Sequence, residues 1–117
     1  MTTPRLSFTK TNYLQVAAST VDDSASVVLP NGETHAVHRF RANGADPEAY
    51  VALIWDYQGA SETIVSSTKG DIDSFFDILN PDMQFIGDGV KKLSIVIIND
   101  NTSQTPIIGG SFELVRV

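Results

Sequence analysis

Hydrophobic and polar residues alternate over many short stretches of this chain, and clusters of Gly, Pro, Asn and Asp separate these stretches. Alternation with a period of two is typical of β-strands, and such clusters mark turns. The pattern predicts strands at 5–9, 13–18, 25–29, 34–41, 49–57, 62–67, 83–86, 91–99 and 111–117.

Two of these segments, 49–57 and 91–99, are apolar at odd and at even positions alike. A strand that is apolar on both sides is typical of the centre of a sheet that is covered on both faces. We therefore expect both segments to be central strands. In the segment 34–41, Arg39 and Arg41 share one face, which indicates a half-buried strand.

Two turns are predicted from glycines. Pro30-Asn31-Gly32 before Glu33 is typical of a hairpin turn with positive φ at Asn31 and Gly32. The pair Gly109-Gly110 indicates a turn before the last strand.

The stretch 71–82 does not alternate, and its reading stays open between a short helix and a loop with apolar anchors. Asp71 would cap a helical turn, and Pro81 would end it. Phe75 and Phe76 lie inside this stretch.

Short strands of this number in 117 residues predict one domain, residues 1–117, with an all-β fold. The expected architecture is an antiparallel two-sheet β-sandwich, and a jelly roll is favoured. An immunoglobulin-like sandwich is the alternative.

Composition narrows the function classes. The formal net charge is -6, which disfavours binding to nucleic acids and to anionic membranes. The first ten residues, MTTPRLSFTK, lack the apolar core of a signal peptide, so a soluble, unprocessed protein is expected. The chain has no cysteine, which removes disulfides and thiolate chemistry.

The residues that carry chemistry form no catalytic or metal-binding motif. His35 and His38 lie three apart on a predicted strand, where side chains point to opposite faces, so the two are not expected to share a metal ion. The aspartates between 71 and 88 do not match the calcium-loop pattern. We expect no enzyme activity, no cofactor and no metal.

Two kinds of binding surface are considered. Arg5, Leu6 and Phe8 form a basic and apolar arm that would dock on a partner or form the first strand of the sheet, and Phe75 and Phe76 are further candidate partner contacts. Alternatively, Trp55, Asp56 and Tyr57 would bind carbohydrate, because two aromatic rings on one strand face beside a carboxylate can stack on a sugar.

Two segments, ETHAVHRFRANGADPEAYVALIWDY and KKLSIVIINDNTSQTPIIGGSFELVRV, resemble small jelly-roll capsid decoration (cement) proteins of tailed phages. This resemblance implies a non-enzymatic structural protein of a virus particle that decorates or reinforces a capsid. It also implies contacts with the major capsid protein or other virion subunits, a homo-oligomer with a trimer favoured, and location in the virion after assembly in the host cytoplasm. It supplies no site residues.

Overall fold

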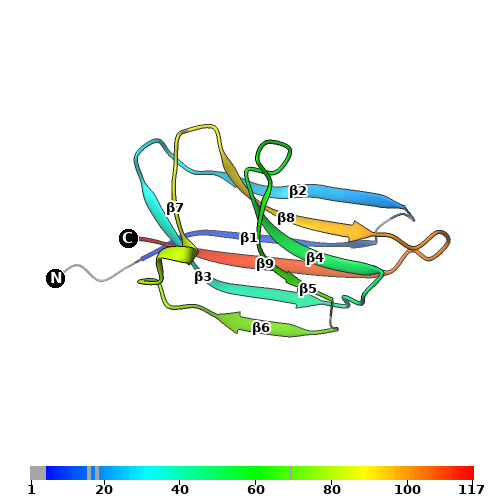
Figure 1. Cartoon of the computed structure of the whole chain (residues 1–117). Coiled ribbons are helices and arrows are strands. Elements are labelled where there is room, and N and C mark those ends of the chain that lie inside the picture. The colour runs from blue at the N-terminus through cyan, green and yellow to red at the C-terminus, as the bar shows by residue number, and fades with distance from the viewer. Residues whose placement is uncertain (1–4, 16, 18, 69) are drawn as a thin grey trace.

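The chain forms two β-sheets that pack face to face (Figure 1). The computed structural model describes residues 5–15, 17, 19–68 and 70–117, and for residues 5–15 and Ser24 it describes the backbone alone. The elements in chain order are β1 (Arg5–Gln15), β2 (Thr20–Val28), β3 (Thr34–Asn43), β4 (Ala49–Trp55), β5 (Glu62–Ser67), β6 (Ile72–Phe75), the 3-10 turn η1 (Pro81–Met83), β7 (Gln84–Ile86), β8 (Lys92–Asn99) and β9 (Ile107–Arg116).

The strands pair in a nested order. Sheet A has the order β1-β9-β3-β6, with β7 also paired to β3, and sheet B has the order β2-β8-β4-β5. β1 therefore pairs with β9, β2 with β8, β3 with β6 and β4 with β5, all antiparallel, and successive pairs alternate between the two sheets. A long hairpin that is rolled up in this way is a jelly roll.

The predicted antiparallel sandwich is thus confirmed, with the favoured jelly-roll topology. The immunoglobulin-like alternative is wrong, because that fold groups its first, second, fourth and fifth strands in one sheet. Here the first and second strands lie in different sheets.

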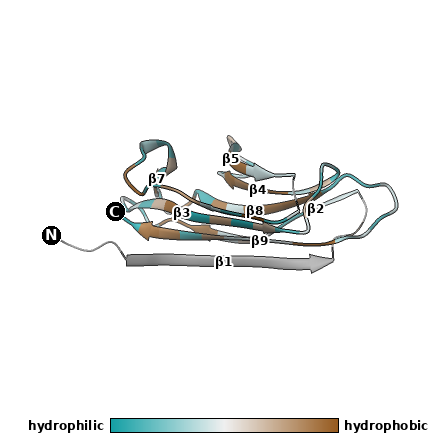
Figure 2. Cartoon of the chain, turned by 90° about the horizontal axis from the view of Figure 1, so that it is seen from below, coloured by the Kyte–Doolittle hydropathy of each residue, from teal (hydrophilic) through white to brown (hydrophobic). Residues whose placement is uncertain are grey.

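The main apolar core lies between the sheets. Phe40 of β3 and Phe112 of β9 are directly opposite each other in sheet A, and both are fully buried. Sheet B covers them with the inner side chains of β4 and β8, which are Val51, Leu53, Leu93, Ile95 and Ile97. Figure 2 shows the two layers and the hydrophobic stretches along β4, β8 and β9.

β4 and β8 are the central strands of sheet B, as their sequence predicts. Their outer faces carry a second apolar cluster formed by Ala52, Ile54 and Val96, against which Tyr57 and Ile98 pack. Side chains of the chain itself therefore cover part of the outer face of sheet B.

Several predicted boundaries were wrong. Segments 5–9 and 13–18 were predicted as separate strands, but Arg5–Gln15 is one strand along β9. The turn at 30–32 is present, with φ +80° at Gly32 alone, but it leads from β2 in sheet B to β3 in sheet A and therefore closes no hairpin.

Gly109 and Gly110 lie inside β9 and form no turn. A Cβ at Gly110 would lie 2.5 Å from Val51 Cγ1 and 3.1 Å from Ile95 Cγ2. The glycine is needed there because sheet B approaches the backbone of β9 closely.

The segment 71–82 contains a strand and is not a helix. Ile72–Phe75 forms β6 at the edge of sheet A, paired with β3. The helical turn comes later, at Pro81–Met83, where the Asn80 side chain accepts a hydrogen bond from the Asp82 amide. Pro81 therefore begins a turn, where the sequence pattern suggested that it ends one.

Candidate functional site

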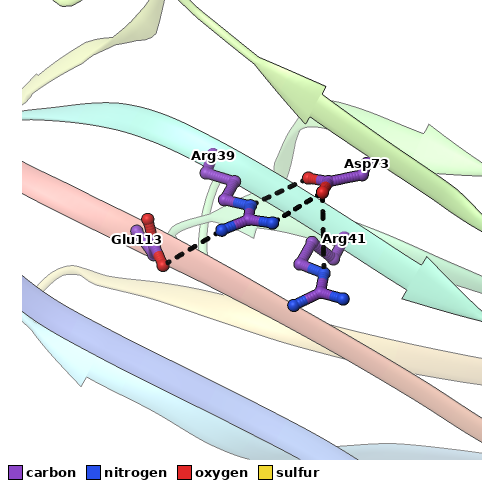
Figure 3. Close-up of polar contacts among 4 residues, drawn as sticks. All are labelled: Arg39, Arg41, Asp73 and Glu113. Carbon is purple, nitrogen blue, oxygen red and sulfur yellow. Dashed lines mark hydrogen bonds and ion pairs between the residues drawn. The ribbon is translucent and has the colours of Figure 1, made fainter.

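A cluster of ion pairs lies on the outer face of sheet A, where the register of three strands brings it together (Figure 3). Arg41 on β3 is opposite Asp73 on β6, and Arg39 is opposite Glu113 on β9. Since directly opposed residues share a face, Arg39, Arg41, Asp73 and Glu113 all point away from the core.

Arg39 is the centre of this cluster. Its Nε donates to Asp73 Oδ1 at 2.9 Å and its Nη2 to Asp73 Oδ2 at 2.6 Å, so the pair is bidentate. Arg39 Nη1 also lies 3.8 Å from Glu113 Oε1, and Arg41 Nε lies 3.9 Å from Asp73 Oδ2. The bidentate geometry fixes the orientation of the guanidinium plane.

These contacts shift two pKa values in opposite directions. The hydrogen bonds from Arg39, together with the positive charges of Arg39 and Arg41, lower the pKa of Asp73 below its ordinary value of 3.8. The hydrogen bond to Asp73 raises the pKa of Arg39. Both residues are therefore charged at neutral pH, and the cluster is a fixed polar feature of this face.

Phe75 lies beside the ion pairs, at the free edge of sheet A. Its side chain is 61% exposed. The Arg39 guanidinium carbon lies 4.8 Å from the centre of its ring, and the His38 ring meets it edge-on at 5.7 Å. Aromatic residues and arginine are among the side chains that are enriched where proteins bind one another.

The other predicted partner contacts fall in different places. Phe76 is half-buried and packs against the main core, so it does not share the exposed position of Phe75. The backbone of Arg5, Leu6 and Phe8 belongs to β1, which makes this segment the first strand of sheet A. The side chains of these three residues lie outside the described part of the structure.

Trp55 and Tyr57 do not form a joint stacking platform. Trp55 packs against the main core, and Tyr57 packs against the outer cluster of sheet B. The predicted shared strand face was wrong because β4 ends at Trp55 and Asp56 takes a positive φ of 55°. The Asp56 carboxylate accepts the Ala60 amide at 3.0 Å, so it shapes the turn into β5.

A groove of about 570 Å³ lies where the edge of sheet B faces η1 and β7. Trp55 lines it and rests on Phe85, with ring centroids 5.2 Å apart. Sequence reasoning missed this groove, because its other residues come from two distant segments that only the packing of the two sheets brings together. These are Glu62, Thr63, Ile64, Pro81, Asp82, Met83, Gln84 and Ile86.

The two histidines lie in different environments, as their spacing predicts. His35 is buried, and its Nε2 lies 3.0 Å from Glu33 Oε1, whereas His38 contacts Phe75. Within the described ranges, no three His, Asp or Glu side chains are grouped so that they would hold a metal ion. No helix in the described part of the chain is long and apolar enough to cross a membrane.

Comparison with known proteins gives little. No family model matches the chain, and no curated protein is similar to it. Among solved structures, the chain is similar to one in the cryo-EM structure of the giant freshwater prawn Macrobrachium rosenbergii extra small virus (XSV) VLP, with 13% identity and a TM-score of 0.31. The match covers 92% of this chain and 77% of that one. A likeness at this TM-score assigns no function to the chain.

Proposed function

We propose that this chain is a non-enzymatic structural protein of a virus particle, acting through protein–protein contacts. More narrowly, the proposal is that it decorates or reinforces a phage capsid by binding the major capsid protein or another virion subunit. It would assemble in the host cytoplasm as a homo-oligomer, with a trimer favoured, and act as a single domain.

The fold is compatible with this role but does not establish it. Jelly rolls include viral capsid domains, lectin domains and enzymes of the cupin type. Because one fold hosts many functions, the surface must supply the argument.

The observation that carries the proposal is an exposed apolar surface at one end of the sandwich. We call this surface the apolar end and define it as Val28, Ile86, Val90 and Val117. Ile86 is 67% exposed, Val90 78% and Val117 50%. Large apolar side chains that gather on a surface mark interaction sites.

Backbone contacts bring these residues to the same end. Thr34 pairs with Ile86, and its carbonyl accepts the Val117 amide at 3.0 Å. The loops 29–33 and 87–91 are joined by four backbone hydrogen bonds, of which the two shortest are Gly87 N to Glu33 O at 2.8 Å and Gly32 N to Gly87 O at 2.9 Å. Figure 1 shows both loops and the C-terminus toward the same end of the molecule.

A second surface, around Arg39 and Phe75, supports a role in assembly. It lies on the outer face and free edge of sheet A and combines an exposed aromatic ring with oriented charges. The net charge of -6 would keep such a protein soluble before it meets its partner.

Light scattering coupled to size-exclusion chromatography tests the assembly. The unmodified chain should elute as an oligomer. The double variant Ile86→Ser/Val90→Ser should assemble more weakly, with a dissociation constant for the oligomer that is about tenfold higher or more. The control is Ile107→Ser, which alters another exposed apolar residue at the start of β9. An unmodified chain that remains a monomer would contradict the homo-oligomer.

Mass spectrometry of purified particles tests the location. Particles of the virus that encodes this chain should contain it in a fixed ratio to the shell subunit after density-gradient purification. Its absence from such particles would overturn the proposed function.

A further inference from the structure

We propose that the groove between β5 and the η1–β7 segment binds an arginine side chain from another protein of the particle. This inference deepens the proposed function, because it names the chemistry of the partner. Its test uses free peptides, so it can fail while the particle assignment stands.

The charges of the groove are unbalanced. Glu62 and Asp82 both line it and are exposed, and none of its other lining residues carries a charge. In the part of the chain that the structure describes, no hydrogen bond or ion pair engages either carboxylate. By contrast, Asp73 and Glu113 both lie against arginines.

The polar groups of the groove are mostly acceptors. Besides the two carboxylates, Gln84 lines the groove, and its Nε2 already donates to the Ile78 carbonyl at 2.7 Å. This bond leaves the Gln84 carbonyl oxygen as an acceptor. A ligand that suits this site must therefore supply several donors and a positive charge.

The aromatic wall narrows the choice to a guanidinium group. Trp55 is half-buried and is held in place by Phe85, so its indole is fixed before any ligand arrives. A planar guanidinium stacks on such a ring while its five N–H groups reach carboxylates, whereas a lysine ammonium offers only a point charge.

Among the side chains that the structure describes, a second copy of this chain offers no arginine that is free of an ion pair. The arginines whose side chains are described, Arg39, Arg41 and Arg116, already lie against Asp73, Glu113 or Glu33. Moving one of them into the groove would break an existing ion pair. An arginine that forms no ion pair on its own protein carries no such cost.

Trp55 is the one tryptophan of the chain, so its fluorescence reports directly on the groove. The probe is the peptide acetyl-Arg-Gly-Arg-amide, titrated at low salt. The matched control peptide carries citrulline, which is neutral and nearly the same shape, in place of both arginines. We expect a saturable change with the arginine peptide that weakens as salt rises, and binding about tenfold weaker with the citrulline peptide.

Two variants connect binding to the groove. Glu62→Gln and Asp82→Asn should each weaken the binding of the arginine peptide by about two- to fivefold, which is the range expected for exposed ion pairs. Glu48→Gln removes the same charge in the loop 44–48 and should leave binding unchanged. Amide NMR shifts with the arginine peptide should be confined to 55, 62–64 and 82–86.

Three results would overturn the inference. The first is equal binding of the arginine and citrulline peptides. The second is equal weakening by Glu48→Gln, which would show attraction to the net charge alone. The third is a fluorescence change with maltotriose and none with the arginine peptide, which would assign the groove to carbohydrate.

Discussion

Trp55 of sheet B packs on Phe85 of sheet A, and this contact joins the two sheets at the edge of the sandwich. Trp55→Ala removes the ring that closes the core there. We expect a loss of about 3 kcal/mol in the free energy of unfolding, the low end for a buried aromatic residue, because Trp55 is only half-buried.

Guanidinium denaturation followed by far-UV circular dichroism measures this loss. Trp55→Phe keeps a ring against Phe85 and should lose much less. A stability of Trp55→Ala equal to that of the parent chain would show that the ring is a surface feature and has no core role.

Gly110 tests the close approach of the two sheets. Gly110→Ala places a methyl group 2.5 Å from Val51 Cγ1, so the sheets must shift apart. We expect a destabilisation of about 1–3 kcal/mol, as for other overpacked cores. Gly70→Ala is the matched control, since a Cβ there would meet nothing within 4 Å. Thermal melts of both variants test this account. A lower melting temperature for Gly70→Ala than for Gly110→Ala would contradict it.

The ion pair of Asp73 predicts how the stability of the fold depends on pH. Its pKa is lowered in the folded chain, so the stabilisation from the ion pair is present above 3.8 and is lost as the pH falls through the lower, folded value. Asp73→Asn should therefore melt below the parent chain at neutral pH, and the two melting temperatures should converge in acid. Asp71→Asn is the control, because Asp71 forms no ion pair in the described structure. A gap between Asp73→Asn and the parent that is constant with pH would argue against the ion pair as its cause.

Phe75 should matter for assembly and little for folding. Since its side chain is largely exposed, Phe75→Ala should change the free energy of unfolding by less than about 1 kcal/mol. If the surface around Arg39 binds a partner, the same variant should reduce binding to purified shells in a co-sedimentation assay. Leu79→Ala, at a residue that is 71% exposed, is the control and should bind as the parent does.

Much of the fold could be predicted from local patterns. The strand at 62–67 was predicted with its observed bounds, because polar turn residues flank a β-branched centre. The central position of β4 and β8 followed from apolar residues on both sides. These features depend on neighbours in the sequence, and so local reasoning finds them.

The failures share a physical cause. Gly109-Gly110 has the sequence of a turn, but it lies inside β9. There a glycine is needed at position 110, because sheet B lies too close to leave room for a side chain. The single positive φ at Asp56 turned Tyr57 away from the face of Trp55. The groove requires two segments that are distant in the sequence, those of Glu62 and Asp82, to line the same surface. Each of these outcomes depends on residues distant in the sequence, which local patterns cannot show.

The position of β9 between β1 and β3 has a consequence for biosynthesis. Among the described strands, β1 pairs in sheet A with β9, which is made after all the others. Until β9 emerges, β1 and one edge of β3 expose unpaired backbone, so we expect the nascent chain to be prone to aggregation. Rapid overproduction should therefore favour inclusion bodies, and cooling the culture should increase the soluble yield.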